Sequence, residues 1–454
     1  MPSFIPPAPN SVTVLIVGQG GREHALAWKL AQSPSVSRIF VLPGNPGTED
    51  AAKTQNVSHI ELNDYEAIVA FAQEKGVGLV VAGPEEAVVD GIGDYFLGSG
   101  IPCFAPSRDA AEIEGSKAYS KTFMKKYRIP TARGQSFEYY SQARAHLKSR
   151  PGKAVIKASG LAAGKGVIVP RDKKEALEAL DDIMVYHRFG REAGRSVVIE
   201  ELVEGEEISL HTFCDDYSHR TLPVGQDQKQ AWIFGPNTGG MGVFTPTTFV
   251  SEKDMEVIDR TIIKPTLDGL DVEGRRFRGL LFTGIMMTKS GPKVIEYNAR
   301  FGDPETQSML PLLSDDTDLC HVLLACATNK LKDVKIGTRS GYACSVVVAS
   351  RGYPYEYEQG HKIEIAPCPK DILIFHAGTR REDGVLKTAG GRVFTVAARG
   401  STLEQAAKRA YDGVALIKFR NSWCRGDISA KWHGIPPVDG EQNEPKPDLG
   451  CTVL

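Results

Sequence analysis

Residues 157–167 read KASGLAAGKGV, and this stretch decides the fold. A lysine at the end of an apolar run, Lys157, is followed by a loop of small residues that holds a second lysine, Lys165, between two glycines. Small residues let backbone amides close over phosphates, and lysines supply the positive charge that transfer of a γ-phosphoryl group requires. The spacing of a Walker A loop is absent. The stretch therefore predicts a phosphate-binding loop of another kind, with a plain hairpin turn as the structural alternative.

Two acidic segments downstream complete this pattern. Residues 198–208, VIEELVEGEEI, are too acidic for an ordinary buried strand and favour a hinge whose carboxylates face a ligand, with a solvated sheet edge as the alternative. In residues 294–304, VIEYNARFGDP, the period of two places Glu296, Asn298 and Arg300 on one face of a strand. Carboxylate and amide oxygens beside a guanidinium are typical of a site for Mg²⁺ and phosphate.

The N-terminal part has the pattern of a doubly wound sheet. Residues 12–17 form a continuous apolar run that is typical of a buried parallel strand. Further short apolar runs alternate with segments of helical pattern, which predicts βαβ units and a parallel sheet. The predicted strands are 12–17, 38–42, 78–82 and 101–105, and the predicted helices include 22–31 and 64–74.

Three turns follow the first three of these strands, at residues 18–21, 43–48 and 83–86. The carboxyl ends of parallel strands meet at one sheet edge, so the three turns together favour a phosphorylated small molecule, although each alone is explained as a turn. The GQGG turn at 18–21 also invites a dinucleotide interpretation. Glu23 stands where the third glycine of that fingerprint belongs, and a monophosphate loop is therefore favoured over a dinucleotide site.

The rest of the chain predicts two further regions. From residue 116 the pattern is α+β, with strands expected at 153–157, 166–169, 197–201, 208–214, 280–288 and 293–297. Strands at 342–350, 373–377 and 392–398, followed by a helix at about 403–417, indicate a small third domain. The predicted domains are 10–114, 115–330 and 331–430, with an acidic, Pro-rich tail or linker at 431–454.

Composition limits the function classes. The 54 basic and 56 acidic residues give no basic excess, which argues against a nucleic-acid partner. The eight cysteines are scattered without metal-site spacing, and no run approaches a membrane span, so we expect a reduced, cytoplasmic protein with no membrane partner. The last four residues, CTVL, have the outline of a prenylation box, but no polybasic segment precedes them and a cut linker is the favoured interpretation.

In this order, the strand lysine, the glycine-rich loop, the acidic hinge and the E-x-N-x-R strand resemble the ATP-grasp superfamily. The chain further resembles the phosphoribosylamine–glycine ligase family over about residues 12–428. The stretches that carry this resemblance are 18–25, 43–47, 160–167, 235–242 and 298–307, joined by 388–393 and 425–428.

The resemblance implies an α/β and α+β multidomain fold, with an N-terminal doubly wound parallel sheet, a central ATP-grasp domain and a small C-terminal α+β domain. It implies that ATP phosphorylates the carboxylate of glycine and that the amine of 5-phosphoribosylamine attacks the acyl phosphate. The products would be glycinamide ribonucleotide, ADP and phosphate, with Mg²⁺ required and Mn²⁺ as an alternative. In many eukaryotes such a ligase is fused to aminoimidazole ribonucleotide synthetase, and the tail after residue 428 is where that junction would fall.

The resemblance also implies roles for individual residues. Those that would contact or cover ATP are Lys117, Lys157, Gly160, Gly164, Lys165, Gly166, Glu200, Val203 and Glu207. Those that would bind the other substrates are Gly20, Gly21, Arg22, Asn45, Gly47, Thr48, Pro84, Glu85, Asp227, Asn237, Thr238, Gly239, Gly240, Met241, Arg300 and Asp303. Of all these, Arg300, Lys157 and Lys165 would be catalytic, while Glu296 and Asn298 would ligate the metal.

The sequence departs from the family pattern in three places. Ser159 stands where many members have an acid, Gln228 stands where His is frequent, and residues 281–287 offer no second acidic metal ligand. Three rival functions remain: a carboxylating ATP-grasp ligase, a dehydrogenase and a non-catalytic nucleotide sensor. The 237–242 loop argues against the first, Glu23 against the second, and the intact Lys, Glu, Asn and Arg set against the third.

Overall fold

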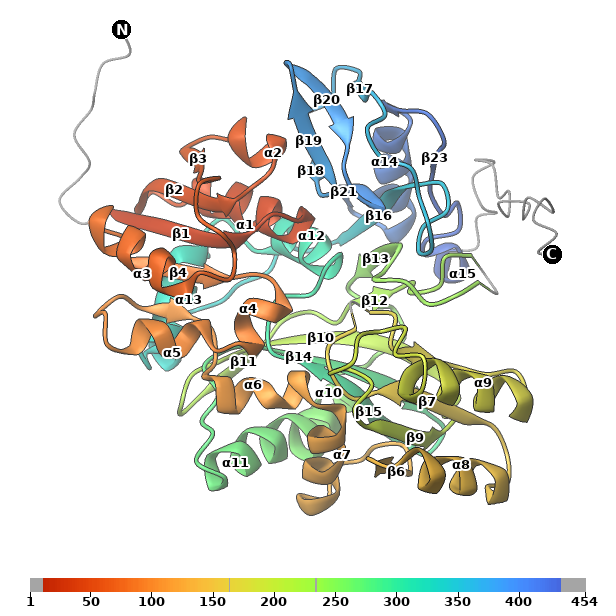
Figure 1. The fold of residues 1–454 in the computed structure, drawn as a ribbon. Coiled ribbons are helices and arrows are strands. Elements are labelled where there is room, and N and C mark those ends of the chain that lie inside the picture. The colour runs from red at the N-terminus through yellow and green to blue at the C-terminus, as the bar shows by residue number, and fades with distance from the viewer. Residues whose placement is uncertain (1–10, 163, 233–234, 434–454) are drawn as a thin grey trace, which may run out of the picture.

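The computed structural model describes residues 11–162, 164–232 and 235–433. Its N-terminal region is a five-stranded parallel sheet with strand order β3-β2-β1-β4-β5, drawn in red and orange in Figure 1. Its elements are β1 (Val12–Gly18), α1 (Gly21–Ala31), β2 (Val36–Pro43), α2 (Pro46–Glu49), β3 (Thr54–Asn56), α3 (Tyr65–Glu74), β4 (Leu79–Ala82), α4 (Glu85–Val89), α5 (Ile92–Leu97), β5 (Cys103–Phe104) and α6 (Arg108–Gly115).

Both faces of this sheet are covered, which explains why β1 reads as a continuous apolar run. Leu15 and Val17 pack in a core that includes residues of α3, α5 and α6. Val14 and Ile16 pack in a second core with residues of α1 and of α13 (Leu319–Ala327). The predicted doubly wound parallel sheet is confirmed.

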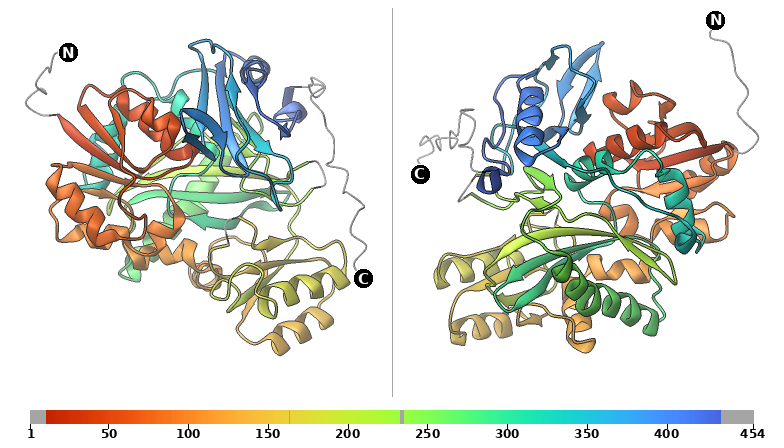
Figure 2. Two further views of the ribbon diagram at one scale, coloured as in Figure 1. Left: turned by 45° about the horizontal axis from the view of Figure 1, so that its top comes forward. Right: turned by 180° about the vertical axis from the view of Figure 1, so that it is seen from behind.

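The central region contains two antiparallel four-stranded sheets, with strand orders β6-β9-β7-β8 and β11-β10-β14-β15. The first sheet carries α8 and α9 and forms the gold lobe at one end of the molecule in Figure 2. The elements are α7 (Lys117–Lys126), β6 (Gly134–Phe137), α8 (Tyr140–Ser149), β7 (Ala154–Ala158), β8 (Val167–Ile168), α9 (Lys173–Met184), β9 (Val197–Glu201), β10 (Glu206–Cys214), β11 (His219–Thr221), β12 (Gln226–Asp227), β13 (Gly242–Thr245), α10 (Glu252–Ile258), η1 (Asp259–Ile263), α11 (Lys264–Val272), β14 (Gly279–Thr288), β15 (Gly291–Asn298), α12 (Glu305–Met309) and η2 (Leu310–Leu312).

The C-terminal region is built on a six-stranded sheet with strand order β12-β13-β16-β21-β18, in which β23 also pairs with β16. Two strands from inside the 115–330 segment thus belong to the C-terminal sheet. Helix α14 packs on this sheet through Leu403, Ala406 and Ala410. The elements are η3 (Leu331–Asp333), β16 (Tyr342–Ser350), β17 (Glu364–Ile365), β18 (Ile372–His376), β19 (Thr379–Glu382), β20 (Val385–Thr388), β21 (Arg392–Gly400), α14 (Leu403–Val414), β22 (Ile417–Lys418), β23 (Ser422–Trp423) and α15 (Ala430–His433).

The acidic segment predicted as a hinge joins the two central sheets. β9 ends at Glu201 and β10 begins at Glu206, so residues 202–205 are the connection between them. No helix in the described ranges is long and apolar enough to cross a membrane. Among the same residues, seven cysteines are present and all are free thiols.

Candidate active site

A cavity of about 720 Å³ lies between the two central sheets and extends to the N-terminal and C-terminal regions. β7, β9, β10, β14 and β15 all contribute to its lining, together with the start of α7. Predicted site residues that line it are Arg22, Glu85, Lys117, Lys157, Gly164, Gly166, Glu200, Val203, Glu207, Asp227, Asn237, Thr238, Gly239, Glu296, Asn298, Arg300 and Asp303. Predicted site residues outside its lining are Gly20, Gly21, Asn45, Gly47, Thr48, Pro84, Gly160, Lys165, Gly240 and Met241.

Glu200, predicted to bind adenine or ribose, lies between two lysines. Its carboxylate is 2.8 Å from Lys157 Nζ and 2.6 Å from Lys121 Nζ, and Lys157 also donates to the carbonyl of Ile295 at 2.8 Å. Burial opposes the charge of Glu200, but the two ammonium groups outweigh burial and lower its pKa. These contacts therefore hold the Lys157 side chain in place in the lining of the cavity.

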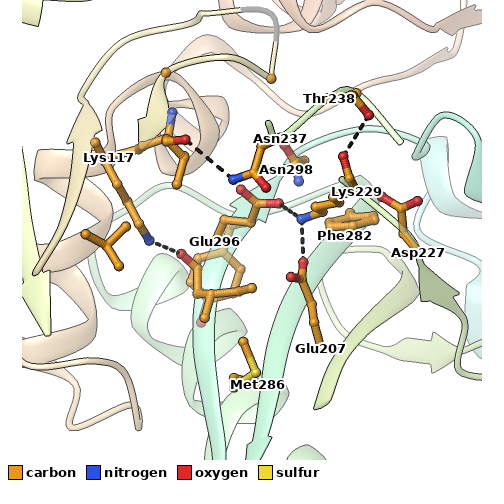
Figure 3. Close-up of a pocket in the computed structure, with 18 of the residues that line it drawn as sticks. Lys117, Glu207, Asp227, Lys229, Asn237, Thr238, Phe282, Met286, Glu296 and Asn298 are labelled. Atoms are coloured by element: carbon orange, nitrogen blue, oxygen red, sulfur yellow. Dashed lines mark hydrogen bonds and ion pairs between the residues drawn. The ribbon is translucent and has the colours of Figure 1, made fainter. Parts of the chain in front are cut away.

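Glu296, predicted to ligate the metal, accepts from the ammonium group of Lys229 at 2.6 Å (Figure 3). Burial raises the pKa of Glu296, but Lys229 more than offsets burial, and the pKa falls to about 2. The carboxylate is thus ionised at neutral pH. Asn298 lies two residues further along β15, and its Oδ1 accepts from Arg300 Nη2 at 3.3 Å.

These residues fit a magnesium ion. Glu296 and Asn298 present a charged and a neutral oxygen, the donor type that Mg²⁺ prefers, and the ammonium group beside Glu296 demonstrates that a cation is accepted there. In the described part of the chain, no group of three or more His, Cys, Asp or Glu side chains is arranged to hold a metal. Oxygen atoms of substrate phosphates and of water are further ligands that Mg²⁺ commonly takes.

Arg300 is already paired with carboxylates. Its Nη2 lies 3.1 Å from Glu114, and its Nε lies 3.6 Å from Glu85. Burial opposes the charge, but Glu114 and Glu85 together raise the pKa of Arg300. Glu114 is also tied to the strand end, because it accepts from the backbone N–H of Ala299 at 2.6 Å. A fixed guanidinium beside Asn298 is suited to stabilising negative charge on a transferring group.

Asp227 contributes a buried carboxylate to the lining of the cavity. It is only 8% exposed, and its Oδ1 has no hydrogen-bond partner in the described structure. Burial first, and then the nearby charge of Glu305, raise the pKa of Asp227 well above its usual range. Such a carboxylate favours the binding of a cationic group, because an added positive charge relieves both effects.

The loop at 237–241 closes this end of the cavity. Thr238 Oγ1 donates to the carbonyl of Lys229 at 2.8 Å, and the backbone N–H of Gly240 donates to Thr238 Oγ1 at 2.9 Å. Arg392, from the C-terminal sheet, donates to the carbonyl of Gly239 at 2.7 Å and to that of Asp303 at 2.7 Å. Gly240 has φ of +111°, and a Cβ there would lie 2.4 Å from Pro304 Cδ and 2.9 Å from Asp227 Oδ1.

We expect Gly240→Ala to lower the free energy of unfolding by about 2–4 kcal/mol, since strain at positive φ and the contact with Pro304 add together. Gly274→Ala is the matched control. Gly274 also has a positive φ, of +72°, but no atom lies within 4 Å of the position that a Cβ would take there, so a loss of about 1 kcal/mol is expected. Calorimetric melting of both variants checks this, and equal losses would refute the role of the contact.

The turn at residues 18–21 holds an anion of its own. The carboxylate of Glu23 accepts from the backbone N–H of Gly20 and from Arg22 Nε, each at 2.5 Å. A Cβ at Gly18 or Gly83 would also touch Glu23. Glu23 therefore caps the N-terminus of α1, and the phosphate-binding role of this turn stays a prediction. Arg22, the residue that follows this turn, lines the cavity.

Both polar atoms of the Asn45 side chain form hydrogen bonds within the protein. Its Oδ1 accepts from the backbone N–H groups of Gly47 and Thr48, and its Nδ2 donates to the carbonyls of Gln19 and His376. These bonds cap α2 and tie it to the first turn and to β18. The phosphate-binding role of this loop stays a prediction.

Several functional residues were missed by the sequence reasoning. Lys229, Glu114, Glu305, Lys121 and Arg392 all contact predicted site residues or determine their charge. Lys229 follows Asp227 by two residues, which is the only local signal that could have indicated it. Glu305 and Arg392 lie in the stretches 298–307 and 388–393 that carry the family resemblance, but no role was assigned to them, and no motif marks Lys121 or Glu114.

Two antiparallel sheets that enclose Lys157, Glu200 and Glu296 define the chain as an ATP-grasp protein. Family models match along its length: "Phosphoribosylglycinamide synthetase, N domain" at residues 12–114, "ATP-grasp (A) domain" at 115–306 and "C domain" at 343–431. The chain belongs to the phosphoribosylglycinamide synthetase family. The expected resemblance is thereby confirmed.

Named relatives agree with this assignment. Phosphoribosylamine–glycine ligase of Halalkalibacterium halodurans is 43% identical, covering 92% of this chain and 97% of that protein. The solved structure of phosphoribosylamine–glycine ligase from Thermotoga maritima matches with a TM-score of 0.77 at 33% identity, over 91% of this chain and 99% of that one. A bifunctional purine biosynthetic protein of Schizosaccharomyces pombe is 49% identical over 94% of this chain but only 54% of its own length. The chain thus spans about half the length of the first curated relatives it matches.

Proposed function

We propose that the chain ligates glycine to 5-phosphoribosylamine in de novo purine biosynthesis, with consumption of ATP. One observation carries the proposal: a single cavity joins the lysine and carboxylate set of an ATP-grasp site to the unpaired carboxylate of Asp227. Proteins named phosphoribosylamine–glycine ligase are 42–43% identical to this chain over nearly their full length, which supports the same activity.

In the first step, a carboxylate oxygen of glycine attacks the γ-phosphorus of ATP, and ADP leaves. Lys117 and Lys157 bind the phosphate chain, while Glu200, Val203 and Glu207 hold adenine and ribose. Glu296 and Asn298 would hold Mg²⁺, or Mn²⁺ in its place, which supplies charge neutralisation at the phosphates. Lys165 and the other residues of the 160–166 loop cover the reacting groups and exclude water.

In the second step, the amine nitrogen of 5-phosphoribosylamine attacks the acyl carbon, phosphate leaves and the nitrogen loses a proton. Arg300 stabilises the negative charge of the acyl phosphate. Asp227 binds the ammonium group of glycine, and the 237–241 loop encloses the small amino acid. The 5-phosphoribosylamine is bound by Arg22, Glu85 and Asp303, together with the turns at 20–22, 45–48 and 84–85.

We also propose the wider context of the chain. Division into domains at 10–114, 115–330 and 331–430 is supported by the extents of the family models. Relatives named bifunctional or trifunctional support fusion to another purine-biosynthetic domain beyond residue 454. Free thiols in the described residues are consistent with a cytoplasmic location, and the substrates are small molecules, with no nucleic acid or membrane involved.

The proposal predicts that turnover releases ADP and phosphate, and never AMP and pyrophosphate. Chromatography of the nucleotide products, with glycine and 5-phosphoribosylamine each omitted in turn, checks both the chemistry and the substrates. ADP should form in proportion to ligated product only when both are present. Formation of AMP in proportion to product, or full ADP release driven by bicarbonate, would overturn the proposal.

A further inference from the structure

Lys229 occupies the centre of the cavity and bridges two carboxylates. Its ammonium group lies 2.5 Å from Glu207 and 2.6 Å from Glu296, as Figure 3 shows. Glu207 is on β10 and Glu296 is on β15, so one lysine joins two strands that are separated by β14. All three side chains are partly exposed to the cavity, between 23% and 28%.

Both partners of Lys229 have other tasks in the proposed function. Glu296 would ligate the metal, and Glu207 would bind the ribose. A Mg²⁺ ion lies about 2.0–2.1 Å from its oxygen ligands. An ammonium group 2.6 Å from the same carboxylate would therefore crowd and repel a metal ion bound there. The ion pair between Lys229 and Glu296 and a metal on Glu296 compete for one position.

Hydrogen bonds fix the backbone of Lys229, whereas the two ion pairs hold the end of its side chain. The carbonyl of Lys229 accepts from the backbone N–H of Thr238 at 2.7 Å and from Thr238 Oγ1 at 2.8 Å. Asp227, two residues earlier, pairs with β13 in the C-terminal sheet. A metal ion can therefore replace the ammonium group of Lys229 at Glu296 through a change in the side-chain rotamer of Lys229, while the backbone next to Asp227 keeps its position.

We propose that Lys229 is a resident counter-cation, which holds Glu207 and Glu296 together in the enzyme without nucleotide and yields Glu296 to a divalent metal only when nucleotide phosphates supply the remaining ligands. The inference rests on the proposed function for the identity of the metal site. Without Lys229, two neighbouring carboxylates would face each other across the cavity, and this arrangement would attract a divalent ion by itself. With Lys229 in place, the metal enters together with the nucleotide.

The test measures metal binding in the absence of nucleotide and substrates. Electron paramagnetic resonance of free Mn²⁺ reports binding directly, and the shift of melting temperature with Mg²⁺ reports it independently. Wild type should bind neither ion at low millimolar concentration, whereas Lys229→Gln should bind Mn²⁺ about tenfold more tightly or better. Lys229→Arg keeps the charge and should behave as wild type, and adding Glu296→Gln to Lys229→Gln should abolish the new binding.

Lys293→Gln is the matched control, because Lys293 pairs with Glu201 at 3.6 Å and does not touch Glu296. It should bind Mn²⁺ no better than wild type. Equal Mn²⁺ binding by wild type and Lys229→Gln, whether tight or absent in both, would overturn the inference. Because no glycine, 5-phosphoribosylamine or ATP is present, this failure is distinct from failure of the proposed reaction, which the substrate-omission assay detects.

Discussion

Glu296→Gln is expected to reduce turnover about 100- to 1000-fold while the protein remains folded, because the variant lacks the charged oxygen proposed to ligate the metal. Lys229 keeps Glu207 as a partner in this variant, so a large loss of stability is not expected. Steady-state ADP release at saturating Mg²⁺ measures the first effect, and thermal melting measures the second. Turnover near that of wild type at millimolar Mg²⁺ would refute the assignment.

The pH dependence provides a further check on this variant. The pKa of Glu296 is about 2 in the folded protein, below the usual value of 4.5, so its pairing with Lys229 stabilises the fold above pH 4.5 and is lost as pH falls toward 2. The ratio of wild-type to variant turnover should therefore be constant between pH 6 and 9. Glu178→Gln, at an exposed site on α9 that pairs with Lys174, should leave turnover within about threefold of wild type.

Regular elements with a strong local pattern could be predicted closely from the sequence. The strands Val197–Glu201 and Tyr342–Ser350 have the predicted bounds, because each contains a short apolar, β-branched run that is buried in its sheet. β10 begins at Glu206, two residues before its predicted start at Ile208. Acidic residues normally end a buried strand, but here Glu206 and Glu207 line the cavity, where Lys431 and Lys229 pair with them.

Pairing between distant segments could not be predicted. β12 contains only Gln226 and Asp227, too short for any periodicity, and its place in the C-terminal sheet depends on the pairing of β13 with β16. Glu296 and Asn298 lie two residues apart on β15, as the period of two predicts, whereas Arg300 lies two residues past the end of this strand and donates to Asn298. Their partner Glu114 lies at the end of α6, and nothing in its local sequence marks it as buried.

The first turn illustrates the same limit. Glycines at residues 18–21 predict a phosphate-binding loop at the start of α1, since a helix N-terminus binds negative charge, and that role stays a prediction. The sequence also placed Glu23 there, but only as the residue that breaks a dinucleotide fingerprint. Its contact with the backbone N–H of Gly20 depends on a side-chain rotamer, which a motif does not specify.

Asp227→Asn is expected to weaken the binding of glycine without lowering the stability of the substrate-free enzyme. Loss of the buried charge that is proposed to pair with the ammonium group of glycine should lower kcat/KM for glycine by the equivalent of about 2–5 kcal/mol, a factor of roughly 30 to several thousand. The same change should leave the substrate-free enzyme as stable as wild type or more stable at pH 8, because a buried carboxylate without a partner at Oδ1 is removed. Substrate kinetics and thermal melting measure the two effects.

The sign of the pH dependence follows from the raised pKa of Asp227. Because the folded protein favours the protonated form, stability from this group is present below the unfolded pKa of about 3.8 and is lost as pH rises through the raised pKa. The melting temperature of wild type should therefore fall relative to that of Asp227→Asn as pH rises, and saturating glycine should narrow the difference. Asp412→Asn, at an exposed site that pairs with Lys408 on α14, is the control and should change neither quantity. A glycine KM that Asp227→Asn leaves unaltered would exclude Asp227 from the glycine-binding site, because no other change in the variant could compensate for the lost ion pair.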